Sequence, residues 1–118
     1  MIDAREARQN QLLASVPDSE LERWLPYLEP VDLPLGKVLY ESGTRLSYVY
    51  FPTTAIVSLL YLMENGASAE IAVVGFEGLV GISLFMGGES TTSRALVQSA
   101  GSGLRLSSQQ MMLEFNRA

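Results

Sequence analysis

The chain has 118 residues, with 8 basic and 13 acidic side chains for a net charge of −5, and it contains neither cysteine nor histidine. The absence of cysteine excludes disulfides and thiolate chemistry, and the absence of histidine excludes the commonest general base and the usual ligands of catalytic metals. With 47% hydrophobic and 18% charged residues, the sequence is long and apolar enough to fold as one domain around a core.

Two short helices are predicted before residue 29. Apolar side chains at positions 12, 13 and 16 give the first its helical spacing, over Ala7–Val16. Ser19 stands three residues before Glu22, which is the spacing of a capping box, and predicts a second helix over Ser19–Leu28. The apolar residues of that helix fall on one stripe, namely Leu21, Trp24, Leu25 and Leu28. We expect this stripe to pack against the sheet that follows.

Strands follow in quick succession, because glycine and polar turn residues divide the rest of the chain into short apolar runs. The predicted strands are Val31–Leu35, Lys37–Tyr40, Tyr48–Phe51, Thr54–Met63, Ser68–Val74, Ser93–Gln98 and Gly103–Leu106. The Asn65-Gly66 dipeptide between two of them fits a type I′ hairpin turn. Such a series of short strands predicts a β-barrel or β-sandwich rather than alternating strands and helices.

A last helix is predicted from Ser107 onward. Ser107 and Gln110 have the spacing of another capping box, and Met111 and Phe115 lie one turn apart. No glycine or proline follows to end the helix before Ala118. This pattern is typical of a domain that has been separated from a downstream segment.

Four segments of the chain are typical, in combination, of one family of sensor domains. They are Asn10–Leu13, Leu35–Gly43, Val49–Pro52 and Gly75–Gly81. In sequence and order they resemble the cyclic-nucleotide-binding (effector) domain of the Crp/Fnr family of bacterial transcription regulators, and the resemblance covers essentially the whole chain. It implies a mainly β fold with flanking helices, in which the strands form a double-stranded β-helix (a jelly roll, or β-roll).

The resemblance also implies how the chain is divided. Residues 1–118 would form a single sensor domain, with N-terminal helices over 1–29, the β-roll over 30–106 and the start of a C-terminal helix over 107–118. In the family a dimerisation helix and a DNA-binding helix-turn-helix follow, so we expect contact with DNA only through a C-terminal domain that is absent from this chain. The expected partners are a small-molecule effector and a second copy of the chain, in a homodimer whose arrangement the effector shifts.

Family members that bind cyclic AMP hold it with a glutamate at the start of a short helix and an arginine on the next strand. In this chain Gly81 matches the glycine before that glutamate, and Ile82 replaces the glutamate itself. Isoleucine cannot accept a hydrogen bond, so a buried ribose hydroxyl would lose its partner at a cost of about 1–3 kcal/mol. In Ser93-Arg94-Ala95 the arginine is displaced by one position, which turns its side chain to the opposite face of the strand.

Glu77 lies just before the predicted short helix, where its carboxylate can accept hydrogen bonds from the free N–H groups and repel a phosphate. The sequence therefore predicts that cyclic AMP is not bound in the usual way, and it indicates no cofactor or metal. A pocket suited to a neutral or apolar ligand is the expectation that remains. The candidate ligand-binding residues are Gly81, Ile82, Ser83, Thr92, Ser93, Arg94 and Ala95.

A β-roll that binds no small molecule and serves as a dimerisation or protein-interaction module is the alternative function. An enzyme is not expected, because metal-dependent jelly-roll enzymes rest on histidine ligands. Scattered arginines and a single lysine form no basic patch, so direct binding of nucleic acid is not expected either. A cytoplasmic location is expected, because the apolar runs fall short of the roughly 20 residues that span a membrane and the acidic N-terminus does not fit a signal peptide.

Overall fold

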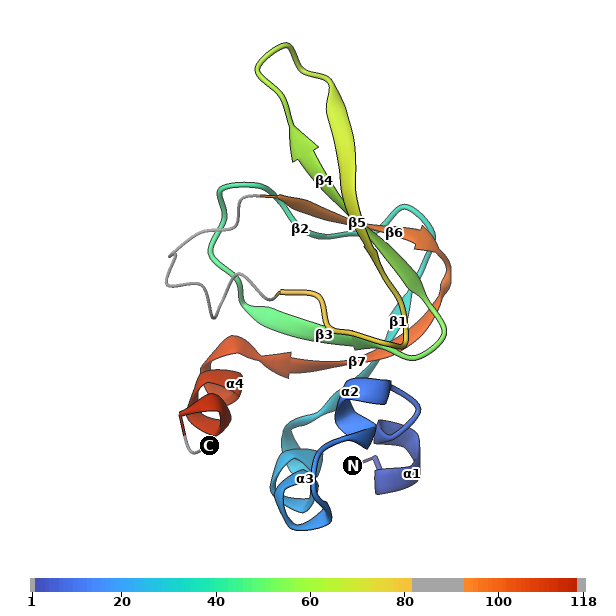
Figure 1. The fold of residues 1–118 in the computed structure, drawn as a ribbon, viewed down its shortest axis with the longest axis vertical. Helices are drawn as coiled ribbons and strands as arrows, with labels where there is room; N and C mark the ends of the chain where they lie inside the picture. The colour runs from blue at the N-terminus through green and yellow to red at the C-terminus, as the bar shows by residue number, and fades with distance from the viewer. Residues whose placement is uncertain (1, 82–92, 117–118) are drawn as a thin grey trace.

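The computed structural model describes residues 2–81 and 93–116, and within them two antiparallel sheets form the body of the molecule (Figure 1). One sheet has the strand order β1-β7-β3 and the other β2-β6-β4-β5. The strands are β1 (Glu29–Leu33), β2 (Val38–Tyr40), β3 (Tyr48–Pro52), β4 (Ile56–Leu62), β5 (Ser68–Val74), β6 (Arg94–Ser99) and β7 (Gly101–Ser107). The predicted fold class is confirmed, and each predicted strand occurs, with ends shifted by no more than one or two residues.

Short helices flank the sheets at both ends of the chain. They are α1 (Ala4–Ala7), α2 (Gln11–Ala14), α3 (Asp18–Trp24), the 3₁₀ turn η1 (Leu25–Tyr27) and α4 (Ser108–Phe115). The single helix predicted over 7–16 is wrong, because Asn10 separates α1 from α2. Its backbone is extended, and its side-chain oxygen accepts hydrogen bonds from the N–H groups of Leu12 and Leu13. An asparagine that bonds to the backbone in this way starts a new helix instead of continuing the old one.

The second predicted helix begins at Asp18, so Ser19 lies inside it, and no side chain makes a capping hydrogen bond at its start. The predicted capping box is therefore wrong. The regular helix also ends earlier than predicted and passes into η1, where Pro26 has no N–H to continue the helical hydrogen bonds. The apolar stripe is confirmed, since its members are buried in or packed against one core: Leu21, Trp24, Leu25 and Leu28.

Side chains that alternate along β3 and β7 contribute to two separate cores. The first core lies between the sheet β1-β7-β3 and the helices that cover its outer face (Figure 1). Its buried members are Ile2, Ala7, Leu13, Leu21, Leu28, Val49, Phe51, Leu104, Leu106 and Met111. The second core lies on the inner side of the roll, between the two sheets. Its buried members are Leu33, Tyr50, Ala55, Val57, Val80, Ala95 and Val97.

The β4–β5 hairpin extends from the body of the roll (Figure 1). Its return strand has the predicted bounds, but the predicted type I′ turn is wrong, because that turn needs positive φ at both central residues. Among the described residues only glycines have positive φ, and at this turn it is Gly66, at 87°. The Gly66 N–H donates to the Met63 carbonyl at 3.0 Å and the Met63 N–H to the Ala67 carbonyl at 2.8 Å. The hairpin thus has a longer loop, which ends at Gly66 in the left-handed backbone conformation.

Helix α4 begins at the predicted cap. The Ser107 hydroxyl accepts a hydrogen bond from the Gln110 N–H at 3.1 Å. The Gln110 side chain does not complete the capping box and donates to Glu114 at 3.4 Å. Glu114 is buried and lies 3.5 Å from the guanidinium of Arg23 on α3, so an ion pair joins the C-terminal helix to the N-terminal ones.

Candidate functional site

Strand β6 carries the predicted arginine on the face opposite the roll interior. Ala95 and Val97 are fully buried in the inner core. The Arg94 side chain is 34% exposed, and its Nε lies 3.1 Å from a carboxylate oxygen of Glu41. Ser93, just before the strand, is buried. The predicted alternation of faces along this strand is therefore confirmed, and Arg94 is not among the side chains that fill the roll.

Gly81 lies directly against β3. Its neighbour Val80 exchanges two backbone hydrogen bonds with Tyr50, at 2.9 and 2.8 Å. Gly81 has φ of 115°, and a Cβ atom there would lie 3.0 Å from Cγ1 of Val49, so the position requires glycine. The predicted site residues Ile82, Ser83 and Thr92 lie outside the described residues, as does the predicted short helix.

The Glu77 carboxylate has a different hydrogen-bond partner from the one expected. Both of its oxygens accept from the N–H of Gly75, at 3.0 and 2.8 Å. Glu77 thus closes a turn that precedes Val80 and Gly81. Its predicted contact with the start of the short helix falls outside the part of the chain that the structure describes.

Sequence reasoning missed a cluster on the inner face of the other sheet. The guanidinium carbon of Arg105 on β7 lies 4.0 Å from the centre of the Tyr48 ring, a cation–π contact. Its Nε donates to a carboxylate oxygen of Glu29 at 3.2 Å. Tyr50 is the direct cross-strand neighbour of Arg105 on β3. The sequence did contain a signal, because Arg105 stands between Leu104 and Leu106 and strand alternation puts it on the opposite face.

Burial and nearby charges shift the pKa values of three side chains in the roll, those of Tyr40, Tyr50 and Arg105. Burial raises the pKa of Tyr40, and a hydrogen bond with Ser93 lowers it in part. Burial likewise raises the pKa of Tyr50, against the opposing effect of the Arg105 charge. Burial acts to lower the pKa of Arg105, but attraction to the Glu29 carboxylate and to the two tyrosines outweighs it, so that the net shift is upward.

Tyr40 and Tyr50 are expected to ionise above the usual tyrosine range in an alkaline titration of the folded protein. Because their folded-state pKa is raised above the unfolded value of 10.0, the stabilisation they contribute is complete below that pH and is lost as pH rises through the folded pKa. Tyrosinate absorbance measures the titration. Tyr40→Phe and Tyr50→Phe should each remove one tyrosine with a raised pKa from the titration of the folded protein. In urea, where the protein is unfolded, neither the parent nor the variants should show a tyrosine with a raised pKa. A single titration step shared by folded and unfolded protein would contradict the prediction.

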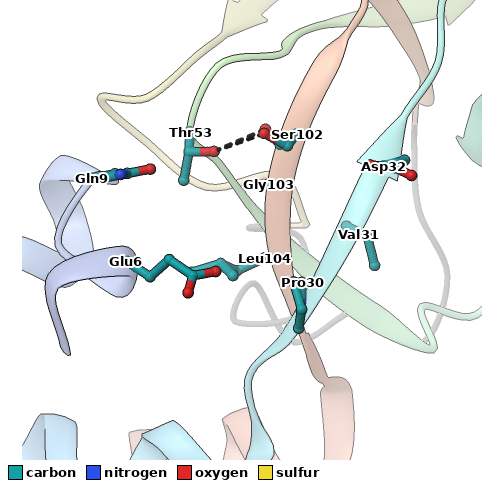
Figure 2. Close-up of a pocket in the computed structure, with 9 residues that line it drawn as sticks. All are labelled: Glu6, Gln9, Pro30, Val31, Asp32, Thr53, Ser102, Gly103 and Leu104. Atoms are coloured by element: carbon teal, nitrogen blue, oxygen red, sulfur yellow. Dashed lines mark hydrogen bonds between the residues drawn. The ribbon is translucent and has the colours of Figure 1, made fainter. Parts of the chain in front are cut away.

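The cavities among the described residues include two whose linings contain no predicted site residue. One, of about 200 Å³, lies between α1 and the outer face of β1 and β7 (Figure 2). It is lined by Glu6, Gln9, Pro30, Val31, Asp32, Thr53, Ser102, Gly103 and Leu104. Within it the Thr53 hydroxyl donates to the Ser102 carbonyl at 3.1 Å. The other, of about 230 Å³, lies at the base of the β4–β5 hairpin beside Val73 and Phe76.

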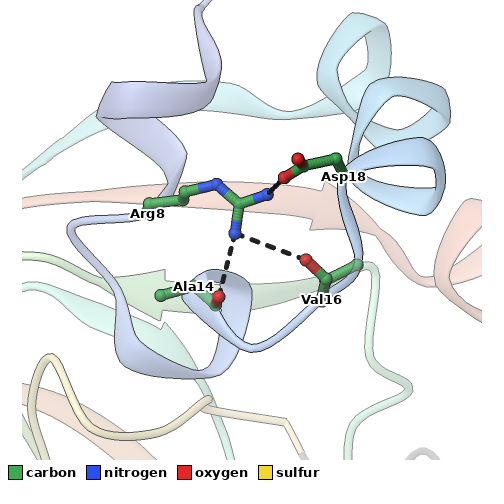
Figure 3. A network of polar contacts seen from close by, with 4 residues as sticks. All are labelled: Arg8, Ala14, Val16 and Asp18. Atoms are coloured by element: carbon green, nitrogen blue, oxygen red, sulfur yellow. Dashed lines mark hydrogen bonds and ion pairs between the residues drawn. The ribbon is translucent and has the colours of Figure 1, made fainter.

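Arg8 joins α1, whose Glu6 lines the first cavity, to the two helices that follow (Figure 3). Its Nη1 donates to the carbonyl oxygens of Ala14 at 2.8 Å and Val16 at 3.3 Å. Its Nη2 forms an ion pair with Asp18 at the start of α3. The last carbonyls of a helix lack partners within the helix, so this arginine satisfies the end of α2 and ties it to both neighbouring helices.

Within residues 2–81 and 93–116, no three acidic side chains gather in a way that could hold a metal ion. No helix of this part of the chain is long and apolar enough to cross a membrane.

No family model and no curated protein matches the sequence. Solved structures do match it. The N-terminal domain of a transcriptional regulator from Streptomyces coelicolor A3(2) is 26% identical, with a TM-score of 0.73, and the match covers 97% of this chain and 78% of that one. The sensor domain of the transcriptional regulator DNR from Pseudomonas aeruginosa is 16% identical, with a TM-score of 0.79, over 97% of this chain and 81% of that one.

A third match is the regulatory subunit of a cAMP-independent protein kinase A from Trypanosoma brucei, in a mutant form bound to cyclic AMP. It is 12% identical, with a TM-score of 0.78 over 89% of this chain, and the chain spans only 39% of its length. The chain has the fold of the cyclic-nucleotide-binding β-roll. The predicted resemblance to effector domains of Crp/Fnr-type regulators is thus confirmed. In this β-roll Ala95 lies in the inner core and Arg105 is the cross-strand neighbour of Tyr50 in that core, whereas Arg94 lies beside Glu41.

Proposed function

We propose that this chain is the ligand-sensing (effector) domain of a transcription regulator, located in the cytoplasm, and that it does not bind cyclic AMP in the usual way. The likeness to the Streptomyces regulator domain and to the sensor domain of DNR, each over 97% of the chain, carries the first part of the proposal. The small-molecule effector would bind inside the roll, and contact with DNA would require a further domain.

The positions of two residues support the second part. Arg94 lies beside Glu41 rather than with the buried side chains of β6. Ile82 stands where the Crp/Fnr pattern has its ribose-binding glutamate. The trypanosome protein with this fold is the regulatory subunit of a cAMP-independent protein kinase A, so the fold alone does not dictate regulation by cyclic AMP.

A signal from the roll has a short route to the C-terminal helix. Ser107 ends β7 and caps α4, and the Ser108 N–H donates to the Ser47 carbonyl, just before β3, at 2.9 Å. Glu114 of α4 in turn pairs with Arg23 of α3. A ligand that moved β7 relative to β3 would alter how α4 is held, and an effector acts through such differences between two arrangements.

Titration calorimetry with cyclic AMP, cyclic GMP and cyclic di-GMP, followed by a thermal-shift screen of small molecules, tests the proposal. We expect no binding of cyclic AMP at tens of micromolar, and stabilisation by at least one other compound. A ligand at a hundred times its Kd stabilises a protein by about 2.7 kcal/mol, which such a screen detects. Tight binding of cyclic AMP would overturn the second part of the proposal. A folded protein that no compound stabilises would overturn the first.

Exposed apolar side chains on the β4–β5 hairpin favour a second candidate, a module for dimerisation or protein interaction. They are Tyr61, Leu62, Met63, Ile71 and Val73. In the described sheet β5 pairs only with β4, and its sequence contains no lysine or proline, the residues that commonly block pairing at a sheet edge. Ile71 and Val73, on this edge strand, are 59% and 49% exposed. Exposed apolar surface of this kind marks interaction sites.

Sedimentation velocity distinguishes this module from a monomeric sensor. If the hairpin pairs two copies, the parent should be a dimer and the double variant Ile71→Lys, Val73→Lys a monomer. Leu12→Lys, at an exposed apolar position of α2, is the control and should leave the dimer intact. A parent that stays monomeric at every concentration rules out self-association as the function of the hairpin.

A further inference from the structure

Arg105 places a positive charge on the inner face of the roll, which Arg94 does not reach. We propose that Arg105 binds an oxyanion of the effector, a carboxylate or a phosphate group, while Tyr48 and Tyr50 contact the body of the ligand. This inference rests on the proposed function and gives its ligand a chemical class. It also replaces the expectation of a neutral ligand, because that expectation was based on Arg94 of β6 and did not include Arg105.

The register of the strands fixes the face on which Arg105 lies. Arg105 pairs with Glu29 of β1 on one side and with Tyr50 of β3 on the other, and the side chains of such cross-strand pairs share a face. Tyr50 belongs to the core inside the roll. The flanking Leu104 and Leu106 belong to the core beneath the helices. The Arg105 side chain therefore extends from β7 on the side that faces the other sheet.

The guanidinium is held in place, yet it keeps donors for a ligand. Tyr48 supports it from one side at 4.0 Å, and Glu29 accepts from its Nε at 3.2 Å. A guanidinium has five N–H donors in a planar fork, which suits bidentate binding of an oxyanion. The Glu29 side chain is 53% exposed, and ion pairs of such exposure contribute little to stability. An incoming oxyanion can therefore replace Glu29 at low cost.

The two tyrosines define what the rest of the ligand must be. The Tyr48 and Tyr50 rings have centroids 6.4 Å apart and are tilted by 54°. Each ring offers an apolar face, and each hydroxyl can donate to an oxyanion. The buried side chains of the same core, Val80 and Ala95 among them, are apolar. A small molecule that joins one oxyanion to an aromatic or aliphatic body matches these surroundings.

The test is an NMR titration of the isotope-labelled whole chain with benzoate and with phenyl phosphate, and with benzyl alcohol as a neutral control of similar size. The Arg105 Nε–H signal, identified by its loss in Arg105→Gln, and the backbone amides of β3 and β7 report binding. We expect both oxyanions, but not benzyl alcohol, to shift these signals, and the tighter binder of the two identifies a carboxylate or a phosphate site. Arg105→Gln should weaken binding by about 10- to 100-fold. Arg94→Gln should not change it.

Other results would overturn the inference. They are unchanged affinity in a folded Arg105→Gln, equal weakening by both arginine variants, or no shift with either oxyanion at millimolar concentration. If Arg105→Gln does not fold, Arg105→Lys keeps the charge but not the planar fork and should still bind several-fold more weakly than the parent. A neutral compound that stabilises the protein when both oxyanions fail would support the sensor function while rejecting the role of Arg105.

Discussion

Replacing Asn10 with alanine is expected to destabilise the protein by about 3–4 kcal/mol. The Asn10 side chain is fully buried, and its oxygen caps α2. Its amide nitrogen donates to the carbonyls of Pro52 and Gly78, at 2.8 Å each. The substitution removes the cap and leaves two carbonyl oxygens without this donor, and an unpaired buried polar group costs about 1–3 kcal/mol. Urea unfolding followed by the fluorescence of Trp24 measures the loss.

Two further variants separate the contributions of Asn10. Asn10→Asp keeps an oxygen for the cap but cannot donate to Pro52 and Gly78, so it should recover little of the lost stability. Asn65→Ala, at the exposed hairpin turn, removes one local hydrogen bond to the Ala67 N–H and should cost less than about 1 kcal/mol. If Asn10→Ala costs no more than Asn65→Ala, the buried hydrogen bonds do not have the role assigned to them.

The second large effect is expected for Phe51→Ala, at about 3–5 kcal/mol. Phe51 is 2% exposed and lies in the core that joins β3 and β7 to the N-terminal helices. Removing its ring leaves a cavity between layers that cannot close without moving a helix. Thermal unfolding followed by circular dichroism should show a much lower Tm for the variant than for the parent.

Phe115→Ala is the matched control for Phe51→Ala. Phe115, on α4, is 50% exposed, so the same deletion removes far less buried surface and should cost less than about 1 kcal/mol. Equal losses in the two variants would show that the core under the helices contributes less than its burial indicates. A large loss only in Phe115→Ala would mean that α4 is covered by another surface in solution.

Local sequence patterns were sufficient to predict those elements whose formation depends on residues close in the sequence. The strand Ser68–Val74 and the cap at Ser107 occur as predicted, since each follows from residues within a few positions. The opposite faces of Arg94 and Ala95 also follow from strand alternation alone. By contrast, Ser19 has the spacing of a cap but lies within α3, because the helix starts one residue earlier, after Pro17.

Features that depend on distant residues could not be predicted in this way. Asn10 bonds to groups 42 and 68 positions away, and nothing in its own segment indicates them. Arg105 looks like one of several scattered arginines until the pairing of β7 with β1 and β3 places it beside Glu29 and Tyr48. The candidate site predicted from the sequence, around Gly81 and β6, therefore stays a prediction, and the part proposed on β7 could be found only from the structure.

The core shared by both ends of the chain limits how the protein can be dissected. Leu13 from the N-terminal helices, Leu106 from the roll and Met111 from α4 meet in that core. A fragment cut at the first strand, to isolate the roll, would expose the outer face of β3 and β7 and would be prone to aggregate. The smallest piece that keeps this core intact in a fusion protein therefore runs from Ile2 through α4, and the fusion joint belongs after Phe115.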